Sequence, residues 1–133
     1  MASSGVSGQF KSWSKMANIL RIGVDESSTK PRRLLLERAG HTVSEASDVR
    51  QVVAACSGVQ FDLIIIGDTL PAKEKLRVST LVQEHCRGTK ILELHSAAQP
   101  DLENADAHLH VNGDAPEELS RWVDQLIARR ESA

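Results

Sequence analysis

The fold of this chain is decided by the stretch FDLIIIGDTLP, residues 61–71. Residues 61–66 are almost all apolar, which is typical of a central parallel strand that helices cover on both faces. Gly67 and Asp68 follow at the place where such a strand usually presents its functional side chain, and Pro71 marks the end of the turn. The stretch therefore predicts a buried strand, and it leaves open whether Asp68 is a reactive carboxylate or a turn residue.

Strands and helices alternate on both sides of this stretch. Short apolar segments predict strands at residues 19–24, 41–46, 61–66, 90–95 and 107–111. Apolar residues three and four positions apart predict helices at residues 31–39, 48–56, 73–86 and 116–130. Leu76, Leu81 and Val82 are expected to face inward from the third helix, and Asp48 or Ser47 is expected to cap the second. The alternation predicts an α/β fold with a parallel sheet, right-handed crossovers and helices on both faces.

The connection between the fourth and fifth predicted strands is unusually short. Only SAAQPDLENAD, residues 96–106, joins them, and Pro100 lies in its middle. So few residues hardly hold a helix together with its two turns, and the proline interrupts any helix that begins before it. We therefore expect the fourth helix of the alternating pattern to be short or absent.

The composition is that of a single globular domain: 133 residues, 41% hydrophobic and 26% charged. Residues 1–15 are rich in Ser and Gly and are expected to form a flexible tail, so that the domain spans residues 16–133. The formal charge of −2 at pH 7 gives no electrostatic reason to expect nucleic acid or an anionic membrane as partner. No segment resembles a signal peptide or a membrane helix, which predicts a cytoplasmic protein.

The two cysteines, Cys56 and Cys86, fall in predicted helices and lack the spacing of metal ligands. Small thiols of this kind are usually buried, and disulfides are rare in a reducing cytoplasm. We therefore expect free thiols rather than a disulfide.

Several segments of the chain resemble the receiver domains of two-component response regulators. They are ILRIGVDE (19–26), LLLERAGHTVSEAS (34–47), FDLIIIGDTLP (61–71), ILELHSA (91–97) and ADAHLHV (105–111). The resemblance extends over about residues 18–130 and is strongest to degenerate, receiver-like proteins. It implies a flavodoxin-like sheet of five parallel strands in the order 2-1-3-4-5, with any ligand site at the carboxyl ends of strands 1, 3 and 4.

The same resemblance implies the parts of a phosphorylation site, and this sequence replaces each of them. A working receiver has two acidic residues after strand 1, which hold Mg²⁺, and these positions fall at Gly23 and Val24. The acceptor aspartate falls at Gly67, the hydroxyl after strand 4 at His95, and the lysine after strand 5 at Val111. The chain is therefore expected to be a pseudo-receiver that binds no cofactor.

A relocated phosphorylation site is the alternative. Asp68 follows the acceptor position, and Asp25 and Glu26 follow the positions of the acidic pair. With these three residues the chain would be an atypical, Mg²⁺-dependent phosphoryl acceptor. A shift of one residue along a strand turns the side chain to the opposite face, so they are more simply explained as solvated loop acids or helix caps.

A second alternative is a metal-binding or small-molecule-binding domain of the flavodoxin-like fold. His108 and His110 alternate on the fifth predicted strand, and His95 ends the neighbouring one. Three imidazoles near one edge could bind zinc if their nitrogens converged, but two polar residues on a short strand and one loop histidine explain the pattern more simply.

These observations together favour a binding module over an enzyme. GVDES after the first strand lacks the glycine spacing of a dinucleotide site. We expect a stand-alone pseudo-receiver that acts as a phosphorylation-independent protein–protein interaction module in bacterial signal transduction. Loss of the fourth helix would expose part of the sheet, so a protein partner or a second copy is expected near Leu109, Trp122 and Ile127.

Overall fold

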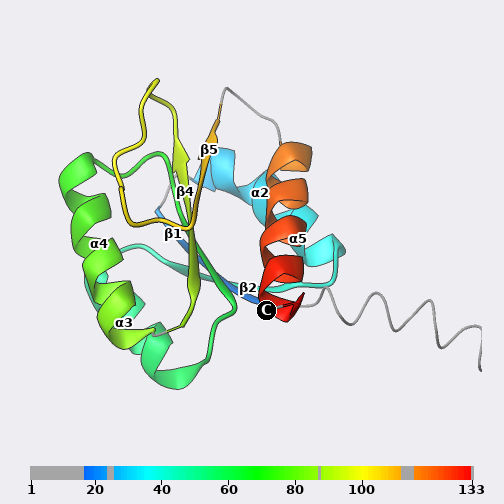
Figure 1. Ribbon diagram of the computed structural model, residues 1–133, viewed down its shortest axis with the longest axis horizontal. Helices are drawn as coiled ribbons and strands as arrows, with labels where there is room; N and C mark the ends of the chain where they lie inside the picture. Colours follow the sequence, from blue (N-terminus) through cyan, green and yellow to red (C-terminus); the bar gives the residue numbers. More distant parts are fainter. Residues whose placement is uncertain (1–16, 24–25, 87, 112–115, 133) are drawn as a thin grey trace, which may run out of the picture.

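The computed structural model of the protein describes residues 17–23, 26–86, 88–111 and 116–132 (Figure 1). Five parallel strands form one sheet in the order β2-β1-β3-β4-β5, which confirms the predicted topology. The strands are β1 (Asn18–Ile22), β2 (Thr42–Ala46), β3 (Leu63–Ile66), β4 (Lys90–His95) and β5 (Ala107–His110). The helices are α2 (Glu26–Arg38), α3 (Val49–Gly58), α4 (Ala72–His85) and α5 (Pro116–Ser132). The expected tail lies outside the described residues.

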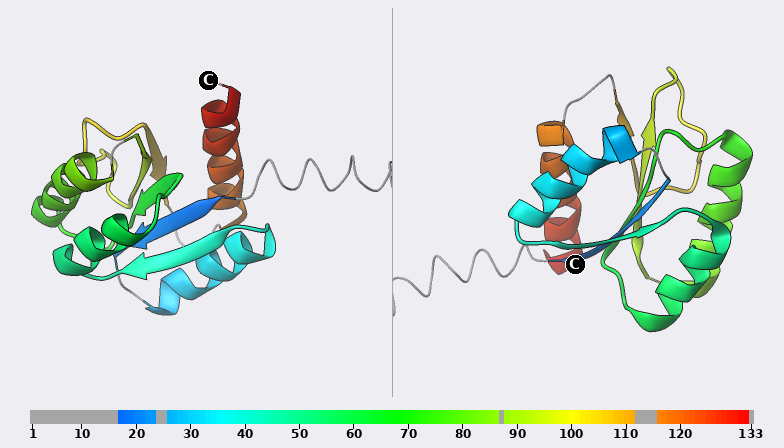
Figure 2. Two further views of the ribbon diagram at one scale, coloured as in Figure 1. Left: turned by 90° about the horizontal axis from the view of Figure 1, so that it is seen from below. Right: turned by 180° about the vertical axis from the view of Figure 1, so that it is seen from behind.

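The sheet separates two hydrophobic clusters. Helices α2 and α5 cover one face, and α3 and α4 cover the other (Figure 2). Leu63 and Ile65 of β3 point into the first cluster, whereas Ile64 and Ile66 point into the second. All four side chains are almost completely buried, because a central parallel strand is covered on both faces. This confirms the prediction made from the apolar run.

Helix α2 differs from its predicted extent. It begins at Glu26, and Pro31 lies inside it rather than at its start. The prediction relied on the preference of proline for the first helical turn, and the structure overrides that local preference. Helix α3 begins as predicted, with Asp48 as its N-cap, because the Asp48 carboxylate accepts a hydrogen bond of 2.9 Å from the Gln51 N–H.

Helix α4 agrees only in part with the predicted inward face: Val82 is buried as predicted and Leu81 is half-buried, but Leu76 is not buried. Its buried residues are Lys75, Val78, Ser79 and Val82, at the spacing of one helical stripe. Leu76 was expected to face inward, but its exposed fraction is 54%. The hydrophobic pattern was misleading here because the inward position is taken by a lysine that has a buried acidic partner, described below.

The connection between β4 and β5 contains no helix. Residues 96–106 form bends and irregular backbone throughout, which confirms the expected loss of a helix here. Leu102 from this connection is nevertheless buried, and it packs into the cluster beneath α3 and α4. The connection therefore follows the sheet as an ordered strap, which we call the β4–β5 strap.

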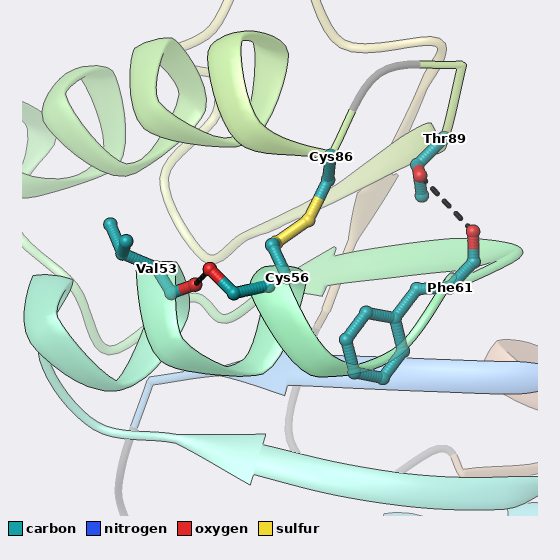
Figure 3. The surroundings of a disulfide bond; sticks show 6 residues. Val53, Cys56, Phe61, Cys86 and Thr89 are labelled. Atoms are coloured by element: carbon teal, nitrogen blue, oxygen red, sulfur yellow. Dashed lines mark hydrogen bonds between the residues drawn. A yellow bond between two sulfur atoms is a disulfide. The ribbon is translucent and has the colours of Figure 1, made fainter.

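The prediction of free thiols is wrong. Cys56 of α3 and Cys86, which caps the C-terminal end of α4, form a disulfide (Figure 3). Their Cα atoms lie 5.4 Å apart, a separation that suits a disulfide. Both helices cover the same face of the sheet, and this packing brings together two residues whose pairing has no signal in the sequence.

Candidate functional site

The carboxyl ends of β1 and β3 meet where a receiver would hold its phosphorylation site. The Gly67 N–H donates a hydrogen bond of 2.7 Å to the carbonyl oxygen of Ile22. A Cβ atom at Gly67 would lie 3.0 Å from that oxygen, and one at Gly23 would lie 3.4 Å from the Gly67 Cα. Gly23 also has a φ of +117°, which disfavours any other residue. The two strand ends are packed backbone to backbone. Val24 lies outside the described residues.

Asp68 is held by an arginine from the first described helix. Its Oδ1 atom lies 3.2 Å from the Nη1 atom of Arg32 in α2, and the side chains are only 6% (Arg32) and 18% (Asp68) exposed. Asp68 is therefore a half-buried turn residue that forms an ion pair, whereas the simpler explanation expected a solvated loop acid or a helix cap. Asp25 and the side chain of Glu26, the other two residues of the relocated site, lie outside the described residues.

Positive charge surrounds this strand end. Arg21 of β1 is buried and lies 3.5 Å from Glu45 of β2, which is its neighbour in the strand register. Burial lowers the pKa of Arg21 to about 10; Glu45 opposes this effect, and nearby Arg32 adds to it. A Mg²⁺ site needs an excess of oxygen anions. Arg21 and Arg32 instead place two buried positive charges near Asp68, which disfavours the binding of a cation there.

His95 and Val111, at the hydroxyl and lysine positions of the phosphorylation site, both make structural contacts. His95 donates a hydrogen bond of 2.8 Å from Nδ1 to the carbonyl oxygen of Ala97. Its ring stacks on that of His110, with the ring centroids 5.1 Å apart. Val111 donates its N–H to the carbonyl oxygen of His95, and its side chain packs against the cluster beneath α2 and α5. Neither position offers the hydroxyl or the ammonium that a phosphoryl group would need.

The three histidines considered for zinc do not converge. His110 donates from Nε2 to the carbonyl oxygen of Ser96, and His95 is bonded to Ala97. His108 instead contacts Glu93 on β4. Among the residues that the structure describes, no three His, Cys, Asp or Glu side chains are grouped to hold a metal ion.

A buried charge cluster, which the sequence analysis missed, lies under α4. The Lys75 ammonium is 2.9 Å from Oε2 of Glu93, 3.1 Å from Oδ2 of Asp101 and 2.9 Å from the carbonyl oxygen of Leu94. Lys75 and Glu93 are 2% and 0% exposed. The signals were present: a lysine three residues before Val78 on the buried stripe, and a glutamate inside an otherwise apolar strand.

Glu93 also holds the β4–β5 strap. Its carboxylate accepts hydrogen bonds from the backbone N–H groups of Asp101, at 2.8 Å, and Leu102, at 3.1 Å. Burial by itself raises the pKa of Glu93, but the bonds from the Asp101 N–H and Lys75 outweigh this and hold it below its ordinary value. The Glu93 carboxylate therefore accepts hydrogen bonds from strap N–H groups, which in a helix would bond to backbone carbonyl oxygens instead.

The predicted interaction surface is only partly exposed. Leu109 and Ile127 are buried in the core, so they offer little to a partner, whereas Trp122 is half-buried. An open groove of about 520 Å³ nevertheless runs between β5 and α5. It is lined by His108, Leu109, His110, Glu118, Arg121, Trp122 and Gln125. The structure therefore moves the candidate contact from the predicted apolar residues to a mixed groove beside them.

Several solved structures of receiver domains are similar to this one. The chemotaxis response regulator CheY4 of Vibrio cholerae is 24% identical, with a TM-score of 0.71, over 84% of this chain and 98% of that one. The receiver domain of an HD domain-containing protein from Pseudomonas fluorescens Pf-5 is 19% identical, with a TM-score of 0.74, over 87% and 98%. The receiver domain of the sensor histidine kinase PA1611 from Pseudomonas aeruginosa PAO1, solved with magnesium in its active-site cleft, is 19% identical, with a TM-score of 0.69, over 84% and 98%.

At these identities the likeness shows the fold, which is the receiver fold, as the sequence suggested. No protein-family model matches the chain, and no curated protein does. None of the described helices is long and apolar enough to cross a membrane.

Proposed function

We propose that this chain is a pseudo-receiver: a binding module of bacterial signal transduction that works without phosphorylation at the strand ends. The observation that supports this most directly is the contact between Gly23 and Gly67, which leaves no side chain where an acceptor would stand. The chain would act through binding another protein or a second copy of itself, and not as an enzyme. With a net charge of −2, neither nucleic acid nor a membrane is the proposed partner.

The electrostatics of the strand ends support the same proposal. Phosphoryl transfer to a carboxylate depends on a cation that offsets the charge of the transferred group, held by carboxylates beside the acceptor. Here the described carboxylate, Asp68, is already paired with Arg32 at 3.2 Å. An attacking Asp68 would first have to leave this partly buried ion pair.

The proposed contact surface is the groove between β5 and α5. Trp122 offers part of an aromatic ring there, and Arg121 and Glu118 provide charges of both signs on the same helix. Aromatic residues and arginine are enriched at the centres of protein interfaces. A groove with a mixed lining fits a protein surface better than a small ligand, for which an enclosed and mainly apolar pocket is usual.

Phosphorylation at the strand ends is tested with acetyl phosphate and Mg²⁺. Intact-protein mass spectrometry of the wild type and of Asp68→Ala should show no added phosphoryl group on a carboxylate in either protein. A phosphoryl group that appears in the wild type and is absent from Asp68→Ala would refute the proposal in favour of the atypical phosphoryl acceptor.

The contact surface is tested by charge reversal. Arg121→Glu, in the groove, is compared with Arg77→Glu, since the Arg77 side chain is 66% exposed on α4 and lies far from the groove. Self-association measured by analytical ultracentrifugation should weaken about tenfold or more in Arg121→Glu and stay unchanged in Arg77→Glu. Equal association of both variants would exclude the groove, and a wild type that stays monomeric at high concentration would exclude self-association.

A further inference from the structure

His108 is oriented by a buried carboxylate. Its Nδ1 atom lies 2.9 Å from Oε1 of Glu93, whose side chain is fully buried. The pKa of Glu93 is held below its ordinary value, so Glu93 is ionised at neutral pH and can only accept a hydrogen bond. Nδ1 of His108 must therefore carry the proton. In the neutral ring, this leaves the lone pair on Nε2.

The second nitrogen of His108 lies on a partly exposed side chain. That side chain is 31% exposed and lies on the same face of the sheet as Glu93 and α4, whereas Leu109, the next residue of β5, packs on the α5 face. Among the described residues, Nε2 of His108 has no hydrogen-bond partner. His110, two residues further along the same strand, is the opposite case, because its Nε2 already donates to the carbonyl oxygen of Ser96.

Glu93 would stabilise the positive charge that develops on the His108 ring when Nε2 attacks an electrophile. Lys75 contributes one positive charge, and Glu93 and Asp101 contribute one negative charge each, so the cluster has a net charge of −1 without His108. When Nε2 attacks an electrophile, the ring becomes an imidazolium that keeps its proton on Nδ1. This cation brings the cluster to neutrality, and the carboxylate at 2.9 Å stabilises it as the aspartate of a Ser-His-Asp triad stabilises its histidine.

We propose that Nε2 of His108 is a nucleophile that accepts a phosphoryl group from a small activated donor such as phosphoramidate or an acyl phosphate. The lone pair of Nε2 forms the N–P bond, the donor's P–N or P–O bond breaks, and ammonia or a carboxylate leaves with the electron pair. The Nδ1 proton stays on the ring, bonded to Glu93.

This site is separate from the strand ends and goes beyond the proposed function. It needs neither Asp68 nor a metal ion, and His108 borders the groove that we propose as the contact surface. A phosphoryl group on His108 would add about 1.5 to 2 negative charges beside that groove. Phosphorylation of His108 would therefore alter partner binding at this surface.

The test uses the full chain with potassium phosphoramidate and no added metal, followed by peptide mapping over time. His85, which is exposed on α4, serves as the internal reference for an ordinary imidazole. We expect His108 to be labelled about tenfold faster than His85, the lower end of the roughly 10- to 100-fold effect of a carboxylate that orients a metal-binding histidine. His108→Gln should lose the fast phase, and His110→Gln should keep it.

The role of Glu93 is checked without a variant that risks unfolding. Nitrogen-15 NMR of the wild-type His108 ring should show Nδ1 protonated and Nε2 bare. Labelling of His108 no faster than that of His85, a fast phase that survives in His108→Gln, or a ring protonated on Nε2 would each overturn the inference.

The stability of the adduct separates this inference from the proposed function. A phosphohistidine survives alkali and is lost in acid, whereas a carboxyl phosphate on Asp68 is lost in alkali. An alkali-labile group would contradict the proposed function and leave His108 unmodified, which would overturn the inference as well. An alkali-stable group on His108 supports the inference and leaves the strand-end proposal intact.

Discussion

Replacement of Lys75 by methionine should reveal how much the buried charge cluster contributes to stability. Methionine fills a similar volume but removes the ammonium and its contacts to Glu93, Asp101 and the Leu94 carbonyl oxygen. Glu93, which is 0% exposed, would then be a buried carboxylate without its cation. Removal of one partner from such a pair costs about 3–5 kcal/mol of the free energy of unfolding. This is a large part of the roughly 5–15 kcal/mol that a small domain has.

The assay is urea unfolding followed by circular dichroism, with Arg77→Met as the matched control. Arg77 lies on the same helix and pairs with Glu74 at 3.7 Å, but the two side chains are 66% and 45% exposed. An exposed pair contributes less than about 1 kcal/mol, so Arg77→Met should change the midpoint little. Lys75→Met combined with Glu93→Gln should be less destabilised than the sum of the single variants, because no buried charge is left unpaired.

Two results would refute this reasoning. The first is a loss of under about 1 kcal/mol in Lys75→Met, which would mean that water screens the pair. The second is strict additivity of the two substitutions. Amide hydrogen exchange gives a local check, because the N–H groups of Asp101 and Leu102 are bonded to the same carboxylate and should exchange faster in Lys75→Met.

Two further predictions concern acid and reductant. In the folded protein the pKa of Glu93 lies below its ordinary 4.5, so the unfolded chain binds this proton more tightly. The stabilisation from Glu93 should be complete above about pH 4.5 and should decline as the pH falls towards the lower folded pKa. Urea midpoints measured across this range should show that decline, and the decline should be smaller in Glu93→Gln. Reduction of the Cys56–Cys86 disulfide should lower the free energy of unfolding by about 4 kcal/mol, as the chain-entropy relation gives for a sequence separation of 30 residues. The double variant Cys56→Ala/Cys86→Ala should not respond to a dithiol reductant, and equal wild-type midpoints with and without reductant would contradict the prediction.

The sequence analysis predicted features that depend on local pattern. The apolar run of β3 was recognised because a central strand excludes polar residues from both faces. The lost helix was recognised because residues 96–106 are too few to form one. Gly67 was assigned to the acceptor position from the resemblance to receiver domains, by its distance from Pro71; in the structure its backbone packs against that of Ile22 and Gly23.

The errors arose where a residue's role depends on a partner far away in the chain. Leu76 was placed inward because apolar residues usually are, but the buried stripe contains Lys75, whose partner Glu93 is 18 residues away. Cys56 and Cys86 were assigned as thiols because their pairing requires two helices to be adjacent on one face of the sheet.

The sequence by itself determined the order of strands and helices along the chain and the burial of the central strand. These follow from hydrophobic period and segment length, which are properties of short segments. The assignment of Gly67 to the acceptor position came from the resemblance to receiver domains. Only the tertiary structure decided that Asp68 pairs with Arg32, and that His108 contacts a buried glutamate. Those contacts depend on how α2, β4 and β5 are oriented in space. No local pattern specifies that orientation, because one period of helix or strand is compatible with many partners across the sheet.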